Sequence, residues 1–140
     1  MKVLRYRLKD VEGVGILEND YIIPLHEFCA VNNIEENVKS LIENWDTLEE
    51  LIIEYIGLKI GAFPLDQNIL LAPIHSPEKF LAIGMNYKKH RAESIDAGIT
   101  PPRNQMWFTK QVSCINDPNG DIIKPESTMM LDYEVELALV

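Results

Sequence analysis

The sequence has few cysteines and no long apolar run, and its first residues do not resemble a signal peptide. Its two cysteines, Cys29 and Cys114, form no disulfide framework of the secreted kind, and neither has a zinc-site partner at ligand spacing. No run approaches the roughly 20 apolar residues that cross a membrane. Residues 1–8 alternate like a strand and lack the apolar core of a secretory signal. We therefore expect a cytoplasmic protein in a reducing environment.

Positive charge is also scarce. The chain has 13 lysines and arginines against 22 aspartates and glutamates, which gives a formal net charge of −9. This balance argues against nucleic acid or an anionic membrane as a partner, because both are negatively charged. It fits a cytosolic protein or a cation binder, and the need for solubility explains it as well.

The first half of the sequence predicts a small α+β unit. Residues 3–7 alternate like a strand, and residues 13–17 and 21–23 predict a hairpin with its turn at residues 18–20. A short helical turn is expected after Leu25.

Apolar residues then recur at helical spacing from residue 34 to residue 56. Asp46-Thr47, followed by two glutamates, resembles a new N-cap, so we expect two helices with a break between them. Gly57 and Gly61 are expected to end the second helix. The apolar stripe is predicted to pack in the core, and we assign it no function.

The second half begins at a predicted linker, residues 72–78, which is polar and interrupted by prolines. Residues 79–84 and 106–110 predict strands, and residues 117–121 predict a turn. A length of 140 residues suits one compact domain or two small ones.

Residues 131–140 alternate between apolar and acidic side chains, which predicts a strand. Asp132, Glu134 and Glu136 then share one face, with neighbouring carboxylates about 6–7 Å apart. Such carboxylates repel each other unless a cation lies between them, and hard divalent cations favour carboxylate oxygens. A solvated sheet face explains the same pattern and is the commoner case.

A second segment combines a histidine and a carboxylate. Gly84 closes a predicted strand, and the residues after it predict a short helix that carries His90 and Glu93 three positions apart. That spacing makes them neighbours on a helix. A carboxylate beside an imidazole sets its tautomer and raises its basicity, as a general base requires. An exposed charge pair on a polar helix gives the same pattern.

Taken in order, these segments resemble the fumarylacetoacetate hydrolase family, and in particular its branch of acylpyruvate hydrolases, oxaloacetate decarboxylases and hydratases or isomerases. The resemblance runs from about residue 72 to residue 140 and extends more weakly to the first half. The motifs are Gly84-x-Asn86-Tyr87-x-x-His90-x-x-Glu93, Trp107-Phe108-x-Lys110, Ile122-x-x-Pro125 and Leu131-Asp132-Tyr133-Glu134-x-Glu136-Leu137.

The resemblance implies a role for seven of these residues. Glu134 and Glu136 match two carboxylate ligands of Mg²⁺ or Mn²⁺. His90 and Glu93 match a water-activating dyad. Lys110 matches a lysine at the margin of the site. The remaining two match the turn that frames the site: Asn86 and Tyr87.

The resemblance also implies a reaction and a fold. The substrate would be a small 2-oxo acid, cleaved by C–C bond hydrolysis or decarboxylation through a metal-stabilised enolate, with the dyad as base. The fold class would be α+β, with a small α+β domain at residues 1–72. Residues 73–140 would begin a β-rich mixed β-sandwich roll, and the family commonly forms homodimers.

Two departures from the family pattern qualify this interpretation. Asn86-Tyr87 stands where the namesake enzyme has a metal-ligating aspartate, which fits the smaller enzymes of the family. The family supplies a further aspartate ligand downstream, and this sequence ends at Val140. We therefore expect an N-terminal portion of such an enzyme. The alternative is a truncated, non-catalytic relative or binding module that needs a complementing chain.

Overall fold

A three-stranded meander opens the chain. The computed structural model describes residues 1–140, and in it β1 (Lys2–Leu8), β2 (Val11–Glu18) and β3 (Tyr21–Pro24) pair antiparallel in order. The two-residue turns Lys9-Asp10 and Asn19-Asp20 have positive φ at both positions. Turns of this kind match the twist of paired strands. The predicted strand and hairpin are confirmed.

Two very short strands complete this sheet. β4 (Phe63–Pro64) pairs with β3, and β5 (Leu70–Leu71) pairs with β1, so the order is β4-β3-β2-β1-β5. Neither strand was predicted from the sequence. Tyr6 packs edge-on against Phe63 on one face of the sheet, with ring centroids 5.2 Å apart.

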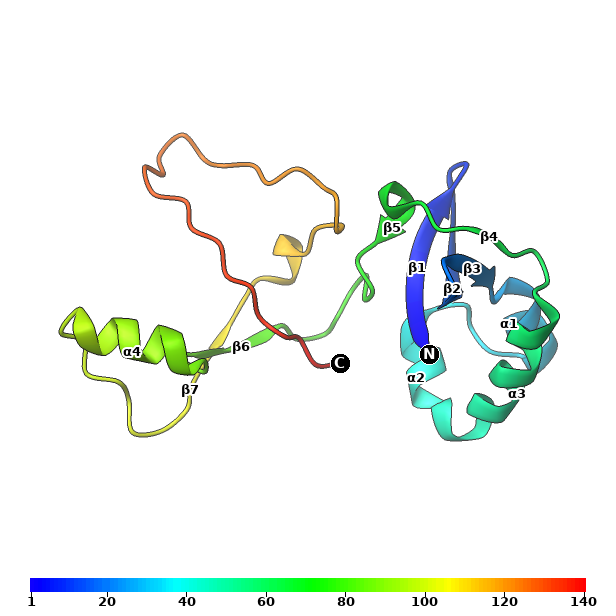
Figure 1. The fold of residues 1–140 in the computed structure, drawn as a ribbon, viewed down its shortest axis with the longest axis horizontal. Helices are drawn as coiled ribbons and strands as arrows, with labels where there is room; N and C mark the ends of the chain where they lie inside the picture. Colours follow the sequence, from blue (N-terminus) through cyan, green and yellow to red (C-terminus); the bar gives the residue numbers. More distant parts are fainter.

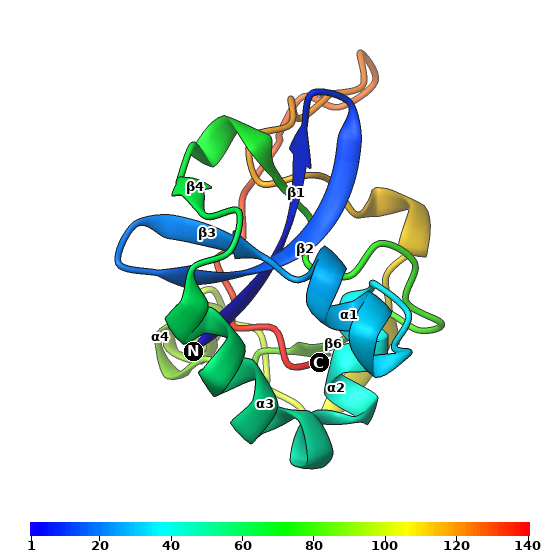
Figure 2. The same ribbon diagram turned by 90° about the vertical axis from the view of Figure 1, so that its right-hand side faces the viewer.

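Three helices cover the other face of the sheet (Figure 2). They are α1 (His26–Asn32), α2 (Val38–Glu43) and α3 (Trp45–Leu58). The predicted break between two helices is confirmed, although it lies at Asn44 and not at Asp46-Thr47.

The end of α3 differs from the prediction. Lys59 is the C-cap, in the left-handed conformation with φ of 53°. Gly57 lies inside the helix and Gly61 lies beyond it. A residue other than glycine therefore makes the turn that ends α3, at a small conformational cost.

The core lies between β2 and the three helices. Cys29 is buried there, and burial raises the pKa of its thiol to about 11, so it is an uncharged core residue at neutral pH. The core cluster consists of Val14, Ile16, Leu25, Phe28, Cys29, Val38, Leu41, Leu48 and Ile52.

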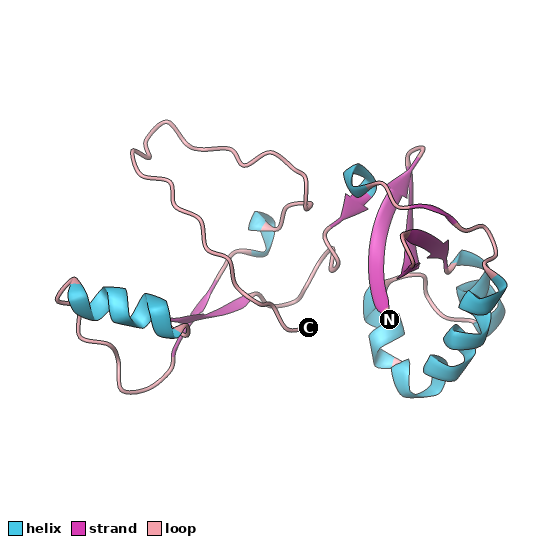
Figure 3. Ribbon diagram, in the orientation of Figure 1, coloured by secondary structure: helices cyan, strands magenta, loops and turns pink.

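The second half of the chain is more open (Figures 1 and 3). β6 (Leu81–Gly84) pairs antiparallel with β7 (Met106–Thr109), and α4 (Lys88–Asp96) lies between them in sequence. These elements follow the predicted strand–glycine–helix–strand order. Near the predicted linker, Arg5 donates to the carbonyl of Ala72 at 2.8 Å. The α+β fold class is confirmed, whereas the division into domains at residue 72 stays a prediction.

The predicted strand over residues 131–140 is not formed. This segment is a loop without a strand partner (red in Figure 1), and its apolar side chains are exposed: Tyr133, Val135, Leu137 and Leu139 are at least 81% exposed. An alternating sequence forms a strand only where a neighbouring strand satisfies its backbone, and no segment of residues 1–140 pairs with this one. None of the helices has the length and apolar character to cross a membrane.

Candidate functional site

A tight turn connects β6 to α4 at the candidate site. Met85 adopts φ of 55°, and Asn86 and Tyr87 follow it before α4 begins at Lys88. Tyr87 is the N-cap residue, and its side chain makes no capping hydrogen bond.

His90 and Glu93 lie side by side on α4, as their spacing predicts. The distance from Nδ1 of His90 to Oε2 of Glu93 is 3.9 Å, and both side chains are exposed, at 57% and 76%. A hydrogen bond between such groups is about 2.7–3.2 Å long. The two groups are therefore oriented toward each other and lie about 1 Å beyond hydrogen-bonding contact.

Two contacts join the acidic segment to the rest of the candidate site. Nζ of Lys110 lies 3.4 Å from Oε2 of Glu134, and the same ammonium is 6.0 Å from the centre of the Phe108 ring. The backbone N–H of Leu137 donates to the hydroxyl of Tyr87 at 2.8 Å. The acidic segment thus contacts two other predicted site residues, Lys110 through Glu134 and Tyr87 through Leu137.

The residues predicted to hold a metal provide suitable donors but not a complete set. Glu134 and Glu136 offer the carboxylate oxygens that Mg²⁺ and Mn²⁺ prefer. Residues 1–140 bring together no group of three histidines, cysteines or acidic side chains able to hold an ion. The ion pair with Lys110 also occupies one oxygen of Glu134. The donor chemistry therefore fits, and further ligands or water would have to complete the coordination.

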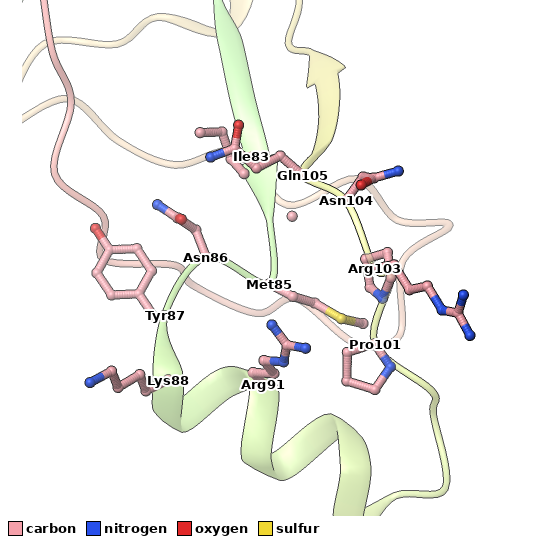
Figure 4. Close-up of a pocket in the computed structure, with 12 residues that line it drawn as sticks. Ile83, Met85, Asn86, Tyr87, Lys88, Arg91, Pro101, Arg103, Asn104 and Gln105 are labelled. Atoms are coloured by element: carbon pink, nitrogen blue, oxygen red, sulfur yellow. The ribbon is translucent and has the colours of Figure 1, made fainter.

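A cavity of about 230 Å³ lies beside the turn (Figure 4). Asn86 and Tyr87 line it, and so do three basic residues that the sequence analysis did not single out: Lys88, Arg91 and Arg103. The basic run from Lys88 to Arg91, in a chain poor in positive charge, is the sequence feature that could have indicated them. The other predicted site residues do not line this cavity.

A second histidine–carboxylate pair lies in the first half of the chain. Nδ1 of His26 is 2.6 Å from Oε2 of Glu36, whose other oxygen accepts the backbone N–H of Val14 at 3.2 Å. The hydrogen bond to Glu36, followed by its negative charge, raises the pKa of His26. This pair fastens the loop before α2 to β2, far in sequence from the candidate site, so we interpret it as structural.

Comparison with known proteins gives a family for the second half of the chain. Residues 79–140 match the family described as fumarylacetoacetate (FAA) hydrolase C-terminal. The chain is 27% identical over 133 residues to the mitochondrial oxaloacetate tautomerase FAHD2A of Bos taurus, an alignment that covers 95% of this chain and 39% of that protein.

Two further relatives align with this chain. A fumarylacetoacetate hydrolase domain-containing protein 2 homolog of Dictyostelium discoideum is 31% identical over 129 residues, covering 90% of this chain and 40% of that protein. A 2,4-didehydro-3-deoxy-L-rhamnonate hydrolase of Sphingomonas is 35% identical over 97 residues, covering 65% and 33%. The chain thus spans 33–40% of the length of these relatives.

The family match contains every residue that the sequence analysis proposed for the site. It begins at residue 79, just before β6, and includes the turn, α4, β7 and the acidic segment. The resemblance inferred from the motifs and the family match therefore agree, and residues 79–140 of this chain belong to the fumarylacetoacetate hydrolase family.

Proposed function

We propose that this chain is part of an enzyme that acts on a small 2-oxo acid with the help of Mg²⁺ or Mn²⁺. The observation that carries the proposal is the family match over residues 79–140, which contains all seven proposed site residues. Relatives named as an oxaloacetate tautomerase and as a hydrolase support an enzyme of this kind. The proposed reaction is either hydrolysis of a C–C bond or decarboxylation.

Glu134 and Glu136 are the proposed metal ligands. A bound divalent cation would act as a Lewis acid toward the oxygens of a 2-oxo acid. Lys110, 3.4 Å from Glu134, keeps that carboxylate in place at the margin of the site. The hydrogen bond from Leu137 to the Tyr87 hydroxyl holds the adjoining backbone against the turn.

His90 is the proposed base. Its Nδ1 faces Glu93, so a proton on Nδ1 leaves Nε2 free to accept a proton from water or from the substrate. The carboxylate of Glu93 would then stabilise the imidazolium that forms. The 3.9 Å separation has to shorten for this to happen, and hydrogen bonds of catalytic pairs are often long before substrate binds.

A second candidate is that these 140 residues bind a ligand or another polypeptide without catalysing a reaction. The exposed apolar side chains of residues 131–140 favour it, because a strand-like apolar segment of this kind suits pairing with another chain. In that case, a complementing chain would supply a strand partner for this segment.

Metal binding tests the proposed ligands directly. Calorimetric titration of the 140-residue chain with Mn²⁺ should show weak binding, which Glu136→Ala abolishes. Glu126→Ala is the matched control, because it removes the same exposed charge outside the proposed site. Binding that is unchanged in Glu136→Ala, or lost equally in both variants, would refute the ligand assignment.

Turnover tests the reaction. Oxaloacetate, acylpyruvates and fumarylacetoacetate should be screened with Mg²⁺ and Mn²⁺, using the chain alone and then the chain with any complementing polypeptide. The His90→Ala variant should lose activity by at least about 100-fold, a typical contribution of a general base. The Glu134→Ala variant should also lose activity, because it removes a proposed metal ligand. Turnover that survives both substitutions would remove the basis for this site.

We also retain two predictions from the sequence, a homodimer and a cytoplasmic location. The relative from Bos taurus is named as mitochondrial. Light scattering of the purified protein and imaging of the tagged full-length protein test these two points.

A further inference from the structure

The cavity beside the β6–α4 turn has an unusual charge for this protein. Of its 12 lining residues three are basic and none is acidic, in a chain with 22 acidic and 13 basic residues. The side chains of Lys88, Arg91 and Arg103 form no ion pair and no hydrogen bond within residues 1–140. Three unpaired cations around one cavity favour an anionic occupant.

Arg91 is the central group of this cavity. Figure 4 shows its guanidinium directed toward the space beneath Asn86 and Met85, while Lys88 and Arg103 project at opposite margins. An arginine in this position can offer two parallel N–H groups to the oxygens of a carboxylate.

The order of the charged residues along α4 argues against a purely structural role for these cations. Lys88, Lys89 and Arg91 lie in the first four residues of the helix, and the acidic residues Glu93 and Asp96 lie later. This order opposes the helix dipole, at a cost of about 0.3–1 kcal/mol for each charge near an end. Residues three and four positions from Lys88 and from Arg91 are not acidic, so no pairing within the helix offsets this cost for these two side chains.

Two amide side chains add neutral donors to the same cavity. Oε1 of Gln105 accepts the indole N–H of Trp107 at 3.3 Å, which leaves the NH₂ group of Gln105 free to donate. The amide of Asn86 makes no side-chain hydrogen bond within the chain and lies in the turn next to Tyr87. The cavity thus combines charged and neutral donors, next to the proposed catalytic residues.

We infer that this cavity binds one carboxylate of a small anionic ligand, with Arg91 as its main contact and Lys88 and Arg103 increasing the local positive potential. A volume of about 230 Å³ suits a small group of this kind and not a large ligand. The identification of this carboxylate as one of the substrate's own rests on the proposed function. The subsite would then select 2-oxo acids that carry a second carboxylate.

Anion binding can be measured without metal and without turnover. The ¹⁵N-labelled 140-residue chain is titrated with malonate at constant ionic strength. The Arg91 side-chain N–H and the backbone amides of residues 84–87 and 103–105 should shift saturably. Arg91→Gln should weaken binding by at least about tenfold, since hydrogen bonds to charged groups contribute about 1.5–3 kcal/mol.

Lys88 and Lys89 provide a matched pair of variants. They are adjacent on α4, and only Lys88 lines the cavity. Lys88→Gln should weaken malonate binding by about two- to threefold, while Lys89→Gln should change it less, because exposed charges beyond the contact are screened by salt. Equal losses in Lys89→Gln and Arg91→Gln, or no saturable shift at the cavity, would overturn the subsite.

Two further measurements separate the subsite from the proposed function. Inorganic phosphate, titrated in the same way, should bind no more tightly than malonate, and tighter phosphate binding would overturn the assignment to a carboxylate. In a protein that turns over oxaloacetate, Arg91→Gln should raise KM by about tenfold. An unchanged KM in Arg91→Gln would overturn the proposal that the subsite binds the substrate, and it would leave the proposed function intact. Malonate binding in a protein without turnover would support the subsite and not the proposed function.

Discussion

Two adjacent isoleucines on α3 allow a controlled test of the core. Ile52 is fully buried, in a cluster that includes Val14 and Leu41, whereas Ile53 is 52% exposed. The substitutions Ile52→Ala and Ile53→Ala remove the same atoms from neighbouring positions of one helix. Any difference between them therefore reports burial and not helix propensity.

The expected effect at Ile52 is large relative to the stability of the predicted small domain. Removing three buried carbon atoms costs about 2.4 kcal/mol in transfer free energy, and the cavity left behind brings the total to about 3–5 kcal/mol. At Ile53 about half of that area is already in water, and the better helix propensity of alanine offsets part of the loss. We expect less than about 1 kcal/mol there. A unit of about 70 residues has a free energy of unfolding of only about 4–10 kcal/mol.

Urea unfolding followed by circular dichroism at 222 nm measures both variants. The midpoint should fall by at least about 1 M urea in Ile52→Ala and by clearly less in Ile53→Ala, with slopes like that of the parent. Similar midpoints for the two variants would show that α3 does not pack as the structure describes. A changed slope would instead indicate that unfolding is no longer two-state.

Three further predictions concern the first half of the chain. Because Glu36 raises the pKa of His26, the stability from this pair is fully present below the unfolded pKa near 6.5 and is lost as pH rises through the folded pKa. A plot of Tm against pH should therefore be flatter above pH 6 in His26→Gln, and an unaltered profile would contradict this. Gly15→Ala should lower Tm, since the new Cβ would lie 2.9 Å from the backbone oxygen of Ile23. Gly57→Ala should raise the free energy of unfolding by about 0.5–1 kcal/mol, because that Cβ meets nothing within 4 Å inside a helix, and a lower Tm there would be inconsistent with the structure.

The elements that the sequence predicts well are those determined by nearby residues. The Asn19-Asp20 turn and the alternation around it specify the hairpin, because a two-residue turn sets the register of its own strands. The helical period between residues 34 and 56 likewise specifies two helices. β4 and β5 were not predicted because a segment of two residues shows no periodicity. They are strands only because β4 pairs with β3 and β5 pairs with β1.

The candidate site shows the same limit. His90 and Glu93 are neighbours because three residues separate them on a helix, which the sequence alone determines. The predicted strand over residues 131–140 required a partner that its own alternation cannot supply. The basic run from Lys88 to Arg91 indicates the positive charge, but the cavity itself depends on how residues 83–105 fold back on themselves, which no local pattern specifies.

The two-residue strands at the sides of the five-stranded sheet affect how the chain can associate. A long unpaired edge is a template for another strand, and natural sheets commonly protect themselves with very short outer strands. β4, which ends in Pro64, covers two residues of β3, and β5 covers only Arg5 and Tyr6 of β1, so the rest of the outer edge of β1 is unpaired. β6 and β7 pair only with each other, and Trp107 is 57% exposed. Association through strand pairing should therefore involve β6 or β7, next to the proposed catalytic residues, or the uncovered ends of β1.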